Sequence, residues 1–216
     1  MEKSEAIVYL ANIKNADAHT LYEKFKDKIE PKRVERIENC KNDNEKKLLT
    51  VTGVLLQGIL AQQGVAASMI GYGLHGKPYV KNRGDVFYNV SHSGDYVMIA
   101  VAGQPVGVDI QKPVPYKETL VNKICSFEER DKLGQEIVKH LNLVWAVKES
   151  YTKLTGEGIT RELAEISFEK NDASLVIKDN GHDAAVGEVV YSDDLYEAVI
   201  AAREPFTISA LNKMMI

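Results

Sequence analysis

The chain is organised around one stretch of sequence, Val144-Trp-Ala-Val-Lys-Glu-Ser-Tyr-Thr-Lys-Leu154. Its spacing predicts a helix, because apolar residues recur at intervals of three and four from Val144 to Leu154. Glu149 and Lys153 lie one turn apart and project from another face, on the same side as Trp145. An exposed Glu–Lys pair stabilises a helix by only ~0.3–0.5 kcal/mol, so this face is either ordinary surface or part of a site.

Length, charge and cysteine content are typical of a soluble globular protein. A chain of 216 residues can form one large domain or two small ones without disulfide or metal support. Its net charge of -4 gives no general reason to expect a nucleic-acid partner. Cys40 and Cys125 are too far apart for a CxxC zinc or redox motif. No apolar run suits a membrane span and no signal-peptide pattern is present, so we expect a cytoplasmic protein without membrane contact.

The order of helical and strand patterns predicts an α+β fold with two halves, residues 1–103 and 104–216. Each half contains a long helix, one from about residue 44 to 64 and one through 145–153, and several antiparallel strands. Pro31 suits the first position of a helix, and Ser126 to Glu129 form a capping box. Asp179-Asn180-Gly181 predicts a hairpin turn.

Two carboxylates stand out from their surroundings. Asp109 interrupts the strand-forming run Val106-Gly-Val-Asp-Ile110, where a carboxylate needs a partner, a solvent-facing side of the sheet or a metal. Glu149 lies on the polar face of the helix described above. Together they offer two hard oxygen ligands of the kind that magnesium prefers.

The sequence also contains cations and hydrogen-bond donors that could bind an anion beside these carboxylates. Lys47, Lys77 and Lys153 supply positive charge, and the turn around Ser91 and His92 offers donors suited to an anion. Each signal alone has an ordinary structural explanation, a turn or a solvated helix face. A solvated helix face also explains most of the cluster formed by Lys28, Lys32, Arg33 and Arg36. In combination they favour phosphoryl-group chemistry on a small molecule rich in phosphate.

At these residues the chain resembles the Sfp-type 4′-phosphopantetheinyl transferases. Segments around Lys32 and Lys47 fit the family loosely. Four segments match in the family's order: Gly76-Lys77-Pro78, Tyr88 to Gly94, Pro105 to Ile110, and Trp145 to Lys153.

The resemblance implies a monomer of two similar α+β halves, related by a pseudo-two-fold axis, with coenzyme A in the cleft between them. It also implies the reaction, which is transfer of phosphopantetheine from coenzyme A to a serine hydroxyl of an acyl, peptidyl or aryl carrier protein. Adenosine 3′,5′-bisphosphate is the other product.

The roles of individual residues follow from the same resemblance. Asp109 and Glu149 would hold Mg²⁺ on the pyrophosphate, and Glu149 would take the serine proton directly or through a water. Lys153 would neutralise the pyrophosphate, with Lys148 assisting. The residues expected to bind the adenosine and its 3′-phosphate are Lys32, Lys47, Lys77, Pro78, Ser91 and His92.

Two positions depart from the family pattern. Gln111 stands where relatives often carry a third acidic ligand, so it is expected either to ligate the metal through its amide oxygen or to leave that place to water. Leu48 replaces a small hydroxyl residue. The alternative function is a non-catalytic module that binds coenzyme A or a carrier protein. Only Gln111 supports that alternative, and the retained Asp109, Glu149 and Lys153 argue against it.

Overall fold

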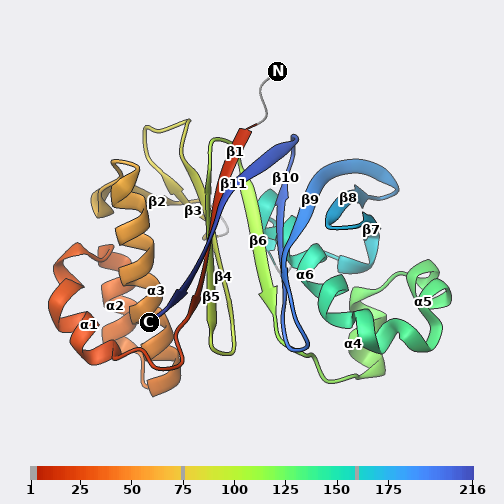
Figure 1. Cartoon of the computed structure of the whole chain (residues 1–216), viewed down its shortest axis with the longest axis horizontal. Coiled ribbons are helices and arrows are strands. Elements are labelled where there is room, and N and C mark those ends of the chain that lie inside the picture. The colour runs from red at the N-terminus through yellow and green to blue at the C-terminus, as the bar shows by residue number, and fades with distance from the viewer. Residues whose placement is uncertain (1–3, 74–75, 159–160) are drawn as a thin grey trace.

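The computed structural model describes residues 4–73, 76–158 and 161–216 and confirms the predicted α+β class. Figure 1 shows helices on both outer sides and strands in the middle. The first half contains β1 (Ser4–Asn12), α1 (Ala18–Phe25), α2 (Pro31–Asn39), α3 (Asp43–Gln62), β2 (Ile70–Tyr72), β3 (Pro78–Val80), β4 (Phe87–Ser93) and β5 (Tyr96–Ala102). The second contains β6 (Val106–Gln111), α4 (Glu118–Ile124), α5 (Phe127–Leu133), α6 (Ile137–Thr155), β7 (Ile166–Asn171), β8 (Ser174–Asp179), β9 (His182–Ser192), β10 (Glu197–Ala202) and β11 (Phe206–Met215).

Two larger sheets form the centre of the molecule. Their strand orders are β11-β1-β5-β4 and β6-β10-β9-β8-β7, and β2 and β3 form a separate hairpin-like pair. The last strand, β11, returns to the first sheet and pairs in parallel with β1, as the crossing blue and red strands of Figure 1 show. The division into residues 1–103 and 104–216 and the pseudo-two-fold relation both remain predictions.

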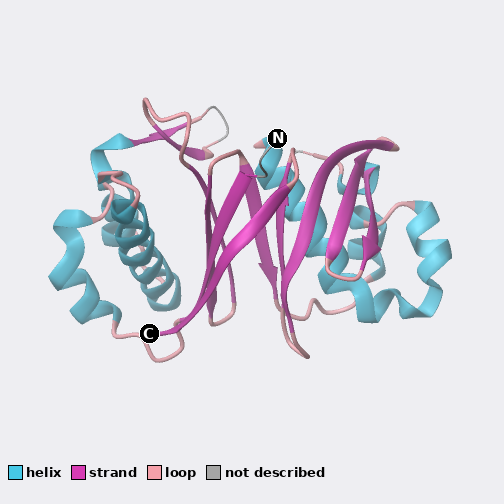
Figure 2. Cartoon of the chain, turned by 45° about the horizontal axis from the view of Figure 1, so that its top comes forward, coloured by secondary structure: helices cyan, strands magenta, loops and turns pink. Residues whose placement is uncertain are grey.

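The core has four layers, helix, sheet, sheet and helix (Figure 2). One apolar cluster lies between α3 and the first sheet, with Leu60 and Ile99 among its members. A second lies between the two sheets, where Leu10 and Val108 are buried. The third joins α6 to the second sheet. It contains the predicted apolar stripe of α6: Val144, Val147, Tyr151 and Leu154.

Local signals set the ends of several elements, and the start of α2 is as predicted. Pro31 is the first residue of α2, and Asn42 caps α3 by accepting a hydrogen bond from the Glu45 N–H. Helix α6 ends at Gly156, whose φ of 82° is left-handed. The predicted capping box of α5 is present, and the predicted turn at Asn180 and Gly181 joins β8 to β9. No helix within the described ranges is long and apolar enough to cross a membrane.

Strand β6 lies unusually close to α6. Residues Val106, Val108 and Ile110 point into the cluster between the sheets, so Gly107 and Asp109 face the helix instead. A Cβ atom at Gly107 would lie 2.0 Å from the Ser150 carbonyl oxygen. Glycine is therefore required here for close approach, which brings Asp109 beside the polar face of α6.

Candidate functional site

Asp109 is the centre of the site. Its side chain is buried, and its Oδ1 accepts hydrogen bonds from Ser91 Oγ at 2.7 Å and Lys153 Nζ at 2.6 Å. Burial raises the pKa of the Asp109 carboxyl, and the nearby Lys153 ammonium opposes that shift. The second oxygen, Oδ2, is buried without a hydrogen-bond partner among the described residues. Because an unpartnered buried carboxylate oxygen is costly, this atom fits a cation ligand.

Glu149 lies on α6, one turn before Lys153, and is half-buried. Burial raises its pKa, and the negative charge of Asp109 raises it further. The two carboxylates are thus close enough to repel each other, an arrangement that a divalent cation would relieve. In the described part of the chain, no group of three or more His, Cys, Asp or Glu side chains is placed to hold a metal ion. The two carboxylates that would hold such a cation are Asp109, through its unpartnered Oδ2, and Glu149.

Gln111 lies two residues beyond Asp109 on the same strand, opposite Glu197 of β10. Its side-chain amide Nε2 donates to the Lys112 carbonyl oxygen at 3.0 Å. The amide oxygen takes no part in this hydrogen bond. The predicted role of Gln111 as a metal ligand remains a prediction.

His92 lies on β4, one residue beyond Ser91. The residue as a whole is exposed, but the surrounding protein removes water from the imidazole and so lowers its pKa. The charge of Lys153 lowers the pKa further, Asp109 acts in the opposite direction, and Arg33 adds to the lowering. His92 therefore lies near both Lys153 of the second half and Arg33 of the first.

Arg33 is a residue that the sequence interpretation missed, because it was grouped with a solvated basic face. Burial lowers the pKa of its guanidinium group, and no carboxylate of the described residues lies within ion-pair distance of it. A sequence signal existed, since Arg33 and the fully buried Ile37 are four residues apart and share one face of α2.

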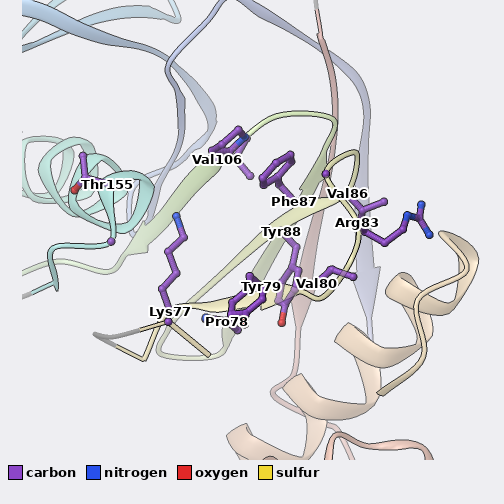
Figure 3. Close-up of a pocket in the computed structure, with 14 residues that line it drawn as sticks. Lys77, Pro78, Tyr79, Val80, Arg83, Val86, Phe87, Tyr88, Val106 and Thr155 are labelled. Carbon is purple, nitrogen blue, oxygen red and sulfur yellow. The ribbon is translucent and has the colours of Figure 1, made fainter. Parts of the chain in front are cut away.

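Lys77 and Pro78 line a cavity of about 480 Å³ (Figure 3). Lys77 Nζ donates to the carbonyl oxygen of Leu154 at 2.8 Å and so links the first half to the end of α6. Burial, assisted by the charge of Arg203, lowers the pKa of Lys77 to about 8. Most of the wall is apolar or aromatic, formed by Tyr79, Val80, Val86, Phe87, Tyr88, Pro105 and Val106.

Two predicted anion ligands lie outside this group. Lys47 Nζ donates to the Lys14 carbonyl oxygen at 2.7 Å, and the residue lines a separate cavity beside Gly94 and Asp95. Lys32 Nζ lies 4.1 Å from the centre of the Tyr72 ring. Neither of these two ammonium groups makes a hydrogen bond or ion pair with Asp109 or His92 in the described part of the chain, and their predicted roles remain predictions.

Lys148 is not part of the cluster formed by Asp109, Glu149 and Lys153. Its side chain is fully buried, and its Nζ donates to the Ile124 carbonyl oxygen at 2.7 Å and to Glu129 at 2.5 Å. Successive helix residues point about 100° apart, so Lys148 and Glu149 face different surroundings. The structure thus assigns Lys148 to holding α4 and α5 against α6, which corrects the expectation that it assists at the pyrophosphate.

Comparisons with known proteins show which family the chain resembles. Residues 105–203 match the family model of the 4′-phosphopantetheinyl transferase superfamily. The transferase psf-1 of Bacillus pumilus is 33% identical over 139 residues, which are 61% of this chain and 59% of that protein. A 4′-phosphopantetheinyl transferase of Bacillus subtilis is 28% identical over 66% of this chain and 67% of its own length. The transferase Sfp of Bacillus subtilis strain 168 is 25% identical over 85% of this chain and 86% of its own length.

Each of these relatives is named as a transferase, which is a group-transfer enzyme. The chain is similar to the 4′-phosphopantetheinyl transferase superfamily over residues 105–203 and to Sfp and related transferases over a larger part of its length, which confirms the family resemblance read from its motifs.

Proposed function

We propose that the protein transfers the 4′-phosphopantetheine group of coenzyme A to a serine hydroxyl of an acyl, peptidyl or aryl carrier protein. Adenosine 3′,5′-bisphosphate would be released, and Mg²⁺ would be required. The observation that carries the proposal is the contact of Lys153 and Ser91 with Asp109, beside Glu149, because it brings two carboxylates and a cation together at one point.

Asp109 and Glu149 would hold the metal, and the unpartnered Oδ2 of Asp109 supports that assignment. A bound Mg²⁺ would supply charge neutralisation for the pyrophosphate of coenzyme A. Lys153, which now pairs with Asp109, would turn its ammonium group toward the same phosphates. Gln111 would contribute a neutral oxygen or leave its place to water.

Glu149 would act as the general base, directly or through a water. The serine oxygen forms a bond to the phosphorus that carries pantetheine, and its proton goes to the Glu149 carboxylate. The bond from that phosphorus to the bridging oxygen breaks, and the bridging oxygen leaves with the nucleotide. A raised pKa suits a carboxylate to this role, since a base is most effective when its pKa approaches the working pH.

The other end of coenzyme A would occupy the first half. The apolar cavity beside Lys77 and Pro78 would take the adenosine, and His92 with the half-buried Arg33 would face its 3′-phosphate. We further propose a cytoplasmic monomer divided at residues 103 and 104, with Lys32 and Lys47 extending the positive field around the nucleotide.

The test is to incubate the protein with coenzyme A, Mg²⁺ and an apo carrier protein and to weigh the carrier by mass spectrometry. Glu149→Gln should lower the transfer rate by at least ~10²-fold, the low end for loss of a general base, with an unchanged circular dichroism spectrum. Near-normal turnover in this variant would exclude Glu149 as the base. Binding of adenosine 3′,5′-bisphosphate without any transfer would favour the non-catalytic alternative.

A further inference from the structure

Strands β4 and β6 are joined through side chains. Strand β6 is the edge of the second sheet, and its free backbone N–H groups meet side-chain oxygens of β4, the edge of the first. Three hydrogen bonds form this side-chain ladder: Val108 N–H to Asn89 Oδ1 at 2.9 Å, Ile110 N–H to Ser91 Oγ at 3.3 Å, and Lys112 N–H to Ser93 Oγ at 3.1 Å.

The ladder is regular. Its acceptors occur at every second residue of β4, and its donors occur at every second residue from Val108 of β6 to Lys112, one residue beyond the end of that strand, so each rung repeats the one before it. This is the spacing of one strand face. Asn89 and Ser91 are buried, whereas the rung at Ser93 is at the exposed end. Buried backbone N–H groups need acceptors, so these side chains fix where β6 lies against β4.

The middle rung connects the ladder to the site. Ser91 Oγ accepts from the Ile110 N–H and from Lys153 Nζ, and it donates to Asp109 Oδ1. A serine hydroxyl has one donor and two acceptor positions, so all three are in use. Ser91 is therefore occupied with holding Asp109 and Lys153 in place.

We propose that the side-chain ladder sets the distance between the nucleotide-binding strand β4 and the metal and base residues that pack on β6. Asn89 forms the rung nearest the cavity that Tyr88 and Val106 line. It is therefore a positioning residue for the transfer. The inference rests on the proposed function. In that function coenzyme A would contact both halves of the protein, whereas a carrier protein need not. A change in the ladder should thus act on coenzyme A selectively.

The experiment compares Asn89→Ala with Asn89→Ser. The two variants differ by a single oxygen atom, and serine is the acceptor that the chain uses at the other two rungs. Exchange of the Val108 amide hydrogen, followed by NMR, should be about fivefold to tenfold faster in Asn89→Ala than in Asn89→Ser, the effect of one lost hydrogen bond. The KM for coenzyme A should rise by a similar factor in Asn89→Ala, with the KM for the carrier unchanged.

The matched control is Asn142→Ala. Asn142 Oδ1 accepts the Val114 N–H at 2.9 Å, a bond of the same type and length outside the ladder. This variant should speed exchange at Val114 and leave the KM for coenzyme A unchanged. If Asn89→Ala does not fold, Ser93→Ala at the exposed rung applies the same test to the Lys112 amide, with an expected change of about threefold.

Two results would overturn the proposal. Unchanged Val108 exchange in Asn89→Ala would show that the rung does not exist in solution. Faster exchange with an unchanged KM for coenzyme A would show that the ladder is structural only. If the wild-type protein transfers nothing, the proposed function fails by itself. The dissociation constant of adenosine 3′,5′-bisphosphate then replaces the KM, and the same comparison decides the ladder.

Discussion

Replacing Gly107 by alanine should separate β6 from α6. The new Cβ would lie 2.0 Å from the Ser150 carbonyl oxygen and 2.4 Å from the Leu154 backbone nitrogen. Ordinary contact begins at 3.4 Å, so helix and strand must move apart by the difference, about 1.4 Å. Both obstructing atoms belong to the backbone, and no change of side-chain rotamer can relieve them.

The cost follows from that displacement. Overpacking of this kind destabilises by ~1–3 kcal/mol, which corresponds to a fall in Tm of about 3–10 °C for a chain of this size. Asp109 lies two residues from Gly107, and Lys153 precedes Leu154, so the 2.6 Å contact between Lys153 and Asp109 must lengthen. A misplacement of about 1 Å can lower a rate by ~10²-fold, and we expect a loss of that order.

The measurements are calorimetric unfolding and the initial transfer rate at saturating coenzyme A. Gly58→Ala is the control, because a Cβ at Gly58 on α3 has no neighbour within 4 Å. It should raise stability by ~0.4–1 kcal/mol and leave the rate unchanged. A Gly107→Ala protein with the wild-type Tm and rate would refute the close approach of β6 to α6.

Three further predictions concern the nucleotide and the metal. His92→Ala should weaken binding of coenzyme A more than that of 3′-dephospho-coenzyme A in calorimetric titrations, because only the former carries the 3′-phosphate; equal losses would assign His92 a structural role. Gln111→Glu should lower, in titrations of the initial rate, the Mg²⁺ concentration needed for half-maximal transfer, since it adds one negative charge; an unchanged midpoint would place residue 111 outside the metal shell. Lys77 loses its proton as the pH rises through about 8, so the affinity for adenosine 3′,5′-bisphosphate should fall between pH 7 and pH 9 more than in Lys77→Met, and parallel profiles would contradict a charge contact at Lys77.

Sequence alone was sufficient where the determining forces act between near neighbours. The apolar stripe of α6 and the turn at Asn180 both follow from spacings of a few residues, and the structure has them as predicted. The sequence motifs also predicted that Asp109, Glu149 and Lys153 are neighbours, and in the structure they are. A carboxylate among strand-forming residues and a polar helix face can both be recognised in the sequence alone.

Tertiary structure alone decided which polar side chains reach that site. Lys148 and Glu149 are adjacent in the sequence, but only packing of α4 and α5 against α6 turns Lys148 into a buried partner of Glu129. Arg33 became a candidate ligand because burial and its charge effect on His92 are visible only in the folded chain. The ladder from Asn89 to β6 likewise depends on two sheet edges that meet in space. Such contacts join residues far apart in the chain, and their energies depend on burial and distance, which no local pattern records.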